Sequence, residues 1–315
     1  MTAQSSRHLV DPELAPMLEL FPTTELTPES LREARGRQIE LPIDPEADKA
    51  VSVERRTIKG PAGDLDVFCM RPVAATGPLP CILHVHGGGY VMGSAETMAP
   101  LRKPLVQALG CALVSVEYRL APETAAPGAV EDCYAALAWL KADPGVAGID
   151  PARIGVMGES AGGGLAAALA LLARDRGEHQ LTFQHLIYPM LDDRTSVEAE
   201  PDPFAGEFIW PHANNLFGWG ALLGVAPGSE GVSHYASPAR AESLAGLPPT
   251  FISTGALDLF VHENIDYARR LIRAGVPTEL HVYPGAFHAF DFVPGADVAT
   301  RARRDSLAAL ARSLR

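Results

Sequence analysis

The chain has 315 residues, of which 47% are hydrophobic and 20% charged, and its formal net charge is −12 at pH 7. This composition predicts one large globular domain or two small ones and excludes extensive disorder. The acidic balance disfavours nucleic acid and anionic membrane surfaces as partners. No run of about 20 apolar residues predicts a membrane span, and residues 1–8 lack the profile of a secretory signal, so we expect a cytoplasmic protein.

Residues 1–50 differ from the rest of the chain because they are rich in Glu, Pro and Leu. They predict two short helices, over residues 12–20 and 28–37. Thr27 is a predicted N-cap, with Pro28 at the first helical position. Helices this short bury little surface alone, so we expect residues 1–50 to pack over another part of the molecule as part of a cap.

Residues 51–191 and 247–315 predict the two parts of an α/β core. The first part begins with two strand-like runs around the turn-forming segment 59–64, which together indicate a hairpin at a sheet edge. Apolar strands then alternate with helices, a pattern typical of a mostly parallel sheet covered on both faces. The predicted strands span 81–85, 112–116, 154–157, 183–188, 250–254 and 279–283, and the predicted helices span 95–109, 129–142, 162–174, 263–274 and 297–314.

Residues 192–246 interrupt this alternation. A structureless loop of that length is uncommon in a compact domain, so we interpret the segment as a small helical insertion that completes the cap. Its aromatic residues are expected mainly to hold the cap on the core, with one or two facing a pocket. They are Phe204, Phe208, Trp210, Phe217, Trp219 and Tyr235.

Neither a metal ion nor another cofactor is predicted. His84 and His86 would share one face of a strand, but no third ligand cluster lies nearby in the sequence. The cysteines lack C-x-x-C spacing and fall in predicted strands or a helix, which indicates buried free thiols. They are Cys69, Cys81, Cys111 and Cys133.

A candidate nucleophile follows the predicted strand 154–157. Residues 158–162 (GESAG) match G-x-S-x-G and lead into an alanine- and leucine-rich helix. In this strand-turn-helix setting the sharp turn holds Ser160 in a strained conformation, and the flanking glycines allow close approach of neighbouring backbone. The hydroxyl then lies at a helix N-terminus, where developing negative charge is stabilised.

A second motif, residues 86–90 (HGGGY), directly follows the predicted strand 81–85. Consecutive glycines let backbone N–H groups converge on one point, as the oxyanion of an acyl-transfer intermediate requires. Each such donor lowers the barrier by about 3 kcal/mol. The run alone could be a flexible turn, but upstream of G-x-S-x-G it predicts an oxyanion hole.

The serine also needs a base and an acid, which in this arrangement follow it in the order acid, then histidine. Asp258 comes after the predicted strand 250–254, and His288 comes after 279–283. Both therefore lie at the carboxyl ends of strands, where ligands bind in open α/β sheets. Weaker alternatives, inside a strand or a helix, are His262, His281 and Asp266.

Taken together, these motifs resemble the hormone-sensitive-lipase-like branch of the α/β-hydrolases, the bacterial carboxylesterases of that group. The matching segments, in order, are 86–89 (HGGG), 118–123 (YRLAPE), 150–154 (DPARI), 158–163 (GESAGG) and the late Asp258 and His288. The resemblance covers roughly residues 40–315. It implies the α/β-hydrolase fold with a mostly parallel eight-stranded sheet, a helical cap, and an oxyanion hole formed by the backbone of Gly88, Gly89 and Ala161.

Two positions depart from the family pattern. The acid motif usually continues Asp-Pro-Leu-x-Asp-Glu, whereas residues 258–263 read DLFVHE. The residue before the serine is often Asp, and here it is Glu159, whose longer side chain can reach different partners. We expect His86, Gly87 and Glu159 to surround the reacting groups without reacting.

The resemblance implies hydrolysis of short- to medium-chain carboxylic esters through a Ser-His-Asp triad and an acyl-enzyme, without a cofactor. A homodimer is also expected by analogy with the family. An amidase or formamidase could use the same triad, because the triad does not select the leaving group. A non-catalytic small-molecule receptor, as in the plant gibberellin receptors, is a further alternative, disfavoured because all three triad residues are present.

Overall fold

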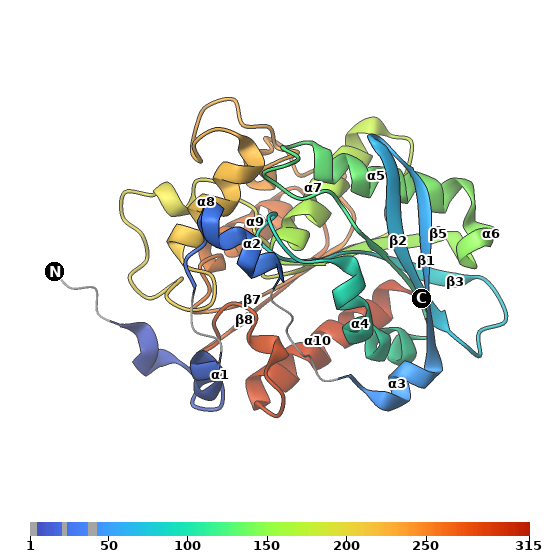
Figure 1. Ribbon diagram of the computed structural model, residues 1–315, viewed down its shortest axis with the longest axis horizontal. Coiled ribbons are helices and arrows are strands. Elements are labelled where there is room, and N and C mark those ends of the chain that lie inside the picture. The colour runs from blue at the N-terminus through green and yellow to red at the C-terminus, as the bar shows by residue number, and fades with distance from the viewer. Residues whose placement is uncertain (1–4, 21–23, 37–42) are drawn as a thin grey trace.

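The computed structural model describes residues 5–20, 24–36 and 43–315 (Figure 1). Position 37, the predicted end of the second helix, lies outside the described residues. The strands are β1 Val51–Gly60, β2 Gly63–Pro72, β3 Leu79–Val85, β4 Ala112–Val116, β5 Ile149–Glu159, β6 Gln184–Ile187, β7 Thr250–Gly255 and β8 Thr278–Tyr283. The α-helices are α1 Ala15–Leu20, α2 Pro28–Gly36, α3 Pro45–Ala50, α4 Ala95–Leu109, α5 Gly128–Ala142, α6 Pro144–Ala147, α7 Ala161–Arg176, α8 His212–Leu223, α9 Val261–Arg273 and α10 Asp297–Ser313.

The described strands form one eight-stranded sheet in the order β1-β2-β4-β3-β5-β6-β7-β8. The β1–β2 hairpin is antiparallel and lies at one edge, and β2 joins β4 in antiparallel register. All the other neighbours are parallel. The predicted fold class is therefore confirmed, and the carboxyl ends of β3, β5, β6, β7 and β8 meet at the same edge of the sheet.

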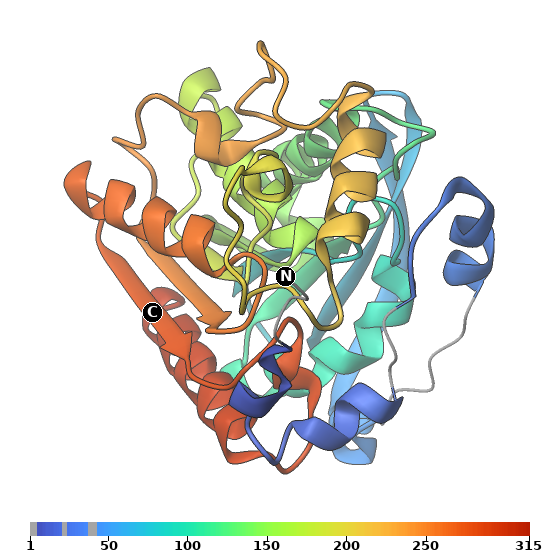
Figure 2. The same ribbon diagram turned by 90° about the vertical axis from the view of Figure 1, so that its left-hand side faces the viewer.

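Helices cover both faces of the sheet, with α5, α7 and α9 on one side and α4 and α10 on the other (Figures 1 and 2). This arrangement follows from the alternation of side chains along each strand. On β3, Leu83 and Val85 pack in the cluster under α5 and α7, whereas Ile82 packs in the cluster under α4 and α10. Because both faces are buried, the central strands are almost continuously apolar.

Local sequence explains several helix boundaries. The Thr27 Oγ1 accepts a hydrogen bond from the Ser30 N–H at 3.1 Å, as expected of the N-cap of α2. The Ser94 Oγ likewise accepts from the Thr97 N–H at 3.3 Å, and α4 ends at Gly110, whose φ is +60°. Such a left-handed residue is a common end for a helix, and glycine adopts it without strain.

The structure extends or adds elements that periodicity did not predict. Helix α3 begins at Pro45, where the Asp44 side chain accepts hydrogen bonds from the N–H groups of Glu46 and Ala47. This Asp-Pro pair is a helix start signal in the sequence, but the helix is too short to show an apolar repeat. Strand β5 begins at Ile149, which pairs with Leu79 of β3. An irregularity in the pairing then shifts the register, so that Cys81 pairs with Ile154.

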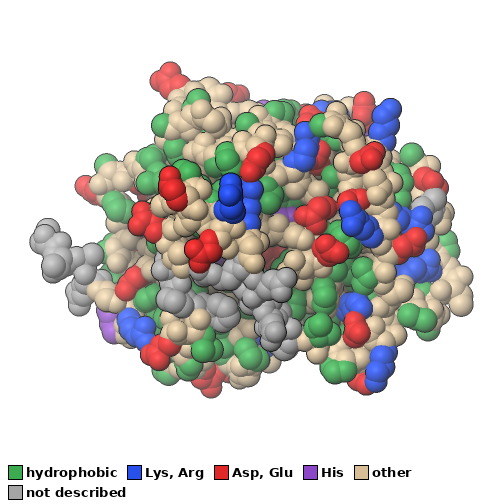
Figure 3. Space-filling view, viewed as in Figure 1, with side chains coloured by type: hydrophobic (Ala, Val, Ile, Leu, Met, Phe, Trp, Pro, Cys, Tyr) green, Lys and Arg blue, Asp and Glu red, His purple; other side chains and the backbone are tan. Residues whose placement is uncertain are grey.

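Residues 192–246 contain α8 and two short 3₁₀ helices. Trp219 of α8 is fully buried, whereas Phe204 is 40% exposed. Cys69 is only partly buried, which corrects the expectation of four buried thiols. On the face shown in Figure 3, the described acidic and basic side chains lie interspersed.

None of the helices in residues 5–20, 24–36 and 43–315 is long and apolar enough to cross a membrane. No group of three or more His, Cys, Asp or Glu side chains within those ranges is placed to hold a metal ion.

Replacing Leu83 by Ala should lower the free energy of unfolding by about 2–5 kcal/mol, because it leaves a cavity in a central, fully buried strand. Val53→Ala on the edge strand β1, where the side chain is exposed, should change it by less than about 0.5 kcal/mol. Urea denaturation of both variants measures the difference. Equal losses would show that the core is not centred on β3.

Candidate active site

Ser160 occupies the sharp turn between β5 and α7, with φ +56° and ψ −123°. A non-glycine residue with positive φ is strained and persists only where its surroundings hold it. The Ser160 N–H donates to the Ile187 carbonyl at 2.9 Å, and the Ser160 carbonyl accepts from the Met190 N–H at 3.0 Å. A Cβ added at Gly162 would overlap the Val85 carbonyl oxygen, so only glycine allows this approach of α7 to β3.

The three predicted catalytic side chains lie together. His288 Nε2 is 2.9 Å from the Ser160 Oγ, and His288 Nδ1 is 2.8 Å from the Asp258 Oδ2. All three residues are at least 94% buried. With Nδ1–H donating to the Asp258 carboxylate, Nε2 is the acceptor that faces the serine hydroxyl. This geometry lets the imidazole take the serine proton.

Two aromatic rings hold the His288 ring in place. Tyr188 contacts it edge-on at 4.8 Å between ring centroids, and Phe260 contacts it at 5.3 Å with an interplanar angle of 87°. The Tyr188 hydroxyl donates to the Asp291 Oδ1 at 2.7 Å. These contacts join loops that follow three different strands, so no local pattern in the sequence indicates them.

The glycine turn that follows β3 lies beside Ser160. A Cβ added at Gly87 would be 3.4 Å from the Ser160 Cβ, and Gly88 and Gly89 both have positive φ. The Gly88 carbonyl accepts from the N–H groups of Val91 and Met92 at 3.1 and 3.0 Å. Because a peptide unit is planar and trans, the Gly89 N–H points away from that carbonyl.

Backbone N–H groups beside Ser160 have no hydrogen-bond partner among the residues that the structure describes and could bind an oxyanion. Within the described residues, no hydrogen bond uses the backbone N–H of Gly88 or Gly89. Ala161 is the first residue of α7, and Ser160 provides no side-chain cap to that helix. The first N–H groups of a helix have no partner within it, so the Ala161 N–H is also available to an anion.

His86 supports the turn and is fully buried. Its Nδ1–H donates to the Gly87 carbonyl at 2.8 Å, and its ring stacks on Tyr118 at 4.2 Å. The Tyr118 hydroxyl donates to the His86 carbonyl at 2.8 Å. Burial lowers the pKa of His86 to about 4, so the ring is neutral at physiological pH.

Glu159 carries a buried charge under the nucleophile. Its Oε2 lies 3.0 Å from the His84 Nε2, and its Oε1 lies 3.0 Å from the Arg102 Nη2 on α4. Burial opposes ionisation of Glu159, but the Arg102 charge and the hydrogen bond with His84 outweigh it and lower the pKa of Glu159 to about 2. Burial also lowers the pKa of His84. With His84 neutral, Arg102 is the charge that balances Glu159.

Helix α9 holds the loop after β6 through two residues that the sequence analysis did not select. The Glu263 Oε1 accepts from the Leu191 N–H at 2.6 Å, and the Asn264 Nδ2 donates to the Pro189 carbonyl at 2.7 Å. Burial raises the pKa of Glu263 well above its ordinary value. Both residues follow Asp258 closely in the sequence. One short segment therefore contains Asp258 and also holds the loop after β6.

The alternative bases and acid bind elsewhere. His281 lies on the edge strand β8, and its Nε2 is 2.9 Å from the Glu279 Oε1. His262 stands where the family usually has Asp, and its Nε2 is 2.6 Å from the Asp202 Oδ2 of the insertion. Asp266 forms an ion pair with Arg269 on the protein surface.

The insertion packs directly on the glycine turn. A Cβ added at Gly89 would overlap the ring of Trp210, and a Cβ added at Gly218 of α8 would be 2.7 Å from the Gly89 carbonyl oxygen. The Trp210 Nε1 donates to the Asn215 Oδ1 at 3.2 Å, which fixes the ring. Trp210 is thus an aromatic residue of the insertion that lies at the predicted oxyanion hole.

Arg102→Met should lower the free energy of unfolding by about 3–5 kcal/mol, because it leaves the Glu159 carboxylate buried without a balancing charge. The double variant Arg102→Met/Glu159→Gln should recover much of that loss. Urea denaturation at neutral pH measures both. If the double variant is as unstable as the single one, the loss comes from packing and not from charge.

Glu263→Gln should make the stability of the protein less sensitive to a rise in pH above about 4.3. The folded-state pKa of Glu263 is raised, so its contribution to stability is complete below its unfolded pKa of about 4.3 and is lost as pH rises through the folded pKa. Glutamine keeps the acceptor for Leu191 without ionising. The urea midpoint of the variant, relative to that of the wild type, should therefore increase as pH rises. A difference between the two midpoints that stays constant with pH would contradict the raised pKa of Glu263.

Comparison with known proteins agrees with this geometry. Residues 82–292 match the model of a family described as having the alpha/beta hydrolase fold. The chain is 33% identical over 312 residues to Carboxylesterase NlhH of Mycobacterium tuberculosis, covering 97% of this chain and 96% of that one. It also matches Esterase LipI of the same organism, with 33% identity over 307 residues and 92% of each chain covered.

Solved structures give the same result. A bacterial heroin esterase superposes with a TM-score of 0.89 and 39% identity, covering 98% of this chain and 99% of that one. A thermostable esterase from Pseudomonas putida superposes with a TM-score of 0.84 and 29% identity, covering 97% of this chain and 98% of that one. The chain therefore belongs to the α/β-hydrolase superfamily, in its hormone-sensitive-lipase-like branch of carboxylesterases, and is an ester hydrolase.

Proposed function

We propose that this protein is a carboxylesterase that hydrolyses short- to medium-chain carboxylic esters through a triad of Ser160, His288 and Asp258. The observation that carries the proposal is the continuous hydrogen-bonded chain from the Ser160 Oγ through both His288 nitrogens to the Asp258 carboxylate, at 2.9 and 2.8 Å. The strained φ of Ser160 supports it, because such strain is stored where function requires it.

Acylation begins when the His288 Nε2 takes the proton of the Ser160 hydroxyl while the Oγ attacks the ester carbonyl carbon. The carbonyl π electrons move to its oxygen, which becomes the oxyanion. Asp258 keeps the imidazole in the required tautomer and stabilises the imidazolium. We assign the backbone N–H groups of Gly88, Gly89 and Ala161 to the oxyanion, each lowering the barrier by about 3 kcal/mol.

The tetrahedral intermediate then collapses, the bond to the alcohol oxygen breaks, and His288 protonates the leaving alkoxide. Water enters, gives a proton to His288 and attacks the acyl-enzyme carbonyl carbon. A second collapse breaks the bond to the Ser160 Oγ and returns the proton to it, releasing the carboxylic acid.

The substrate range follows from the apolar residues next to the triad. Trp210 lies against Gly89, and the rings of Tyr188 and Phe260 pack on His288. These apolar surroundings of the triad favour uncharged acyl and alcohol groups over charged ones. Relatives named carboxylesterase and heroin esterase are consistent with ester substrates.

We also propose that residues 1–50 and 192–246 form a cap over the catalytic core made of residues 51–191 and 247–315. Two hydrogen bonds support this division, because the buried side chain of Asn214 in α8 accepts from the Leu26 N–H and donates to the Thr24 carbonyl. A homodimer and a cytoplasmic location stay predictions.

The alternative functions have no comparable support. A receptor that has lost catalysis does not need three triad groups at reacting distances, and these are present. Amide hydrolysis would use the same groups, so matched ester and amide substrates with the purified protein distinguish the two reactions. Covalent labelling of Ser160 by a fluorophosphonate probe distinguishes an enzyme from a receptor.

Ser160→Ala should lower kcat on p-nitrophenyl esters by about 10⁴-fold or more, because it removes the hydroxyl that forms the acyl-enzyme. Ser52→Ala, an exposed serine on β1, should retain wild-type kcat. A series of acyl chain lengths measures the rates and the preferred substrate. Activity that survives in the Ser160 variant would refute the nucleophile assignment, and a preference for long acyl chains would refute the substrate range.

A further inference from the structure

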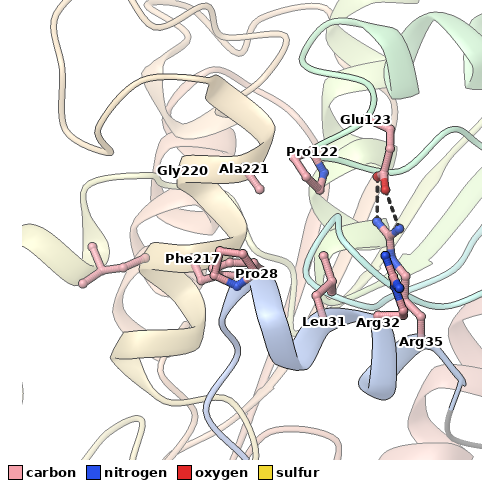
Figure 4. Close-up of a pocket in the computed structure, with 10 residues that line it drawn as sticks. Pro28, Leu31, Arg32, Arg35, Pro122, Glu123, Phe217, Gly220 and Ala221 are labelled. Atoms are coloured by element: carbon pink, nitrogen blue, oxygen red, sulfur yellow. Dashed lines mark hydrogen bonds and ion pairs between the residues drawn. The ribbon is translucent and has the colours of Figure 1, made fainter.

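An arginine of the N-terminal helix α2 reaches the loop that carries the glycine turn. The Arg35 Nε donates to the Val91 carbonyl at 2.7 Å, and the Arg35 Nη2 donates to the Ala121 carbonyl at 2.7 Å. Nη1 and Nη2 also donate to both oxygens of Glu123, at 2.7 and 2.8 Å. Figure 4 shows this paired contact between Arg35 and Glu123. One guanidinium thus joins two loops that come from different strands.

These contacts close a ring around the glycine turn. Val91 donates its N–H to the Gly88 carbonyl and accepts from Arg35 with its own carbonyl. Ala121 donates its N–H to the Tyr90 carbonyl at 3.0 Å and likewise gives its carbonyl to Arg35. The Gly88 carbonyl belongs to the same planar peptide as the Gly89 N–H, so the direction of that N–H depends on where Val91 is held.

Only an arginine can make this set of contacts. Its planar fork presents donors in fixed directions, whereas a lysine ammonium is a compact charge that would reach one or two of these acceptors. Arg35 lowers the pKa of Glu123 to about 2, so the carboxylate stays ionised and holds the fork in position. The Arg35 side chain is 28% exposed and that of Glu123 is 63% exposed, so water competes more for the Glu123 pair than for the part-buried bonds to the Val91 and Ala121 carbonyls.

We propose that Arg35 is a positioning residue that orients the Gly88–Gly89 turn for the oxyanion, which makes α2 a support of the catalytic centre. The proposal rests on the function proposed above. Arg35 touches no reacting atom and acts through Val91 and Ala121. Its loss should therefore weaken stabilisation of the transition state more than binding of the substrate.

The same helix supplies a matched control. Arg32 lies one turn earlier and, like Arg35, lines a cavity of about 530 Å³ between α2 and α8 (Figure 4). It is exposed and makes no hydrogen bond or ion pair with any described residue. Arg32→Ala therefore removes an equal charge from the same helix without touching the glycine turn.

The kinetic experiment compares Arg35→Ala, Arg35→Lys and Arg32→Ala on one p-nitrophenyl ester. Arg35→Ala should lower kcat about tenfold with KM nearly unchanged, less than the roughly 100- to 1,000-fold expected for removing an oxyanion donor outright. Arg35→Lys should fall between Arg35→Ala and the wild type. The Ki of a trifluoromethyl ketone, whose serine adduct carries the oxyanion, should rise by the same factor as kcat falls.

Three kinetic outcomes would overturn the proposal. The first is equal kcat in Arg35→Ala and Arg32→Ala. The second is a change in KM alone. The third is a loss of thermal stability in Arg35→Ala with wild-type kcat in the folded enzyme, which would make Arg35 merely structural.

A second measurement does not depend on activity. Amide hydrogen exchange, followed by NMR, should be faster at Val91 and Met92 in Arg35→Ala than in Arg32→Ala, because both N–H groups bond to the Gly88 carbonyl. Equal exchange rates would overturn the positioning role. If the wild type hydrolyses no ester while exchange still differs, the proposed function fails and the support of the turn by Arg35 stands.

Discussion

The close approach of the β5–α7 turn to the end of β3 is the constraint on which the rest of the site depends. Gly162 faces the Val85 carbonyl so closely that any side chain there would overlap it. The chain must therefore reverse within one residue, and Ser160 takes the positive φ that results. Hydrogen bonds to Ile187 and Met190 hold that conformation, so strand β6 and the loop that follows it are part of the turn.

Two buried glutamates near this turn show how partners decide the state of a carboxyl group. Glu159 faces the Arg102 guanidinium, and its pKa falls to about 2 despite complete burial. Glu263 has backbone N–H and hydroxyl partners but forms no ion pair with a cation in the described part of the chain, so burial prevails and its pKa rises. Both carboxyl groups organise loops around the triad. Asp258 alone among these three acids bonds to His288.

The glycine turn is contacted from two sides by segments far from it in the sequence. Arg35 of α2 holds the Val91 carbonyl, and Trp210 and Gly218 of the insertion pack on Gly89. The conformation of Gly88 and Gly89 is intrinsically free, because glycine has no Cβ to restrict it. A turn that must aim N–H groups at one point consequently needs its neighbours to fix it, and both neighbouring segments provide that restraint.

The sequence by itself determined the sheet and most helices, and it predicted the three side chains, Ser160, Asp258 and His288, that the structure brings within hydrogen-bond distance. Apolar periodicity, turn residues and the order of the motifs are local signals, and parallel strands bring their carboxyl ends to one edge. Only the tertiary structure decided that Arg35, Arg102, Tyr188 and Glu263 surround that edge. Their partners lie on other elements, and a contact between distant segments leaves no periodic or spaced pattern in the chain.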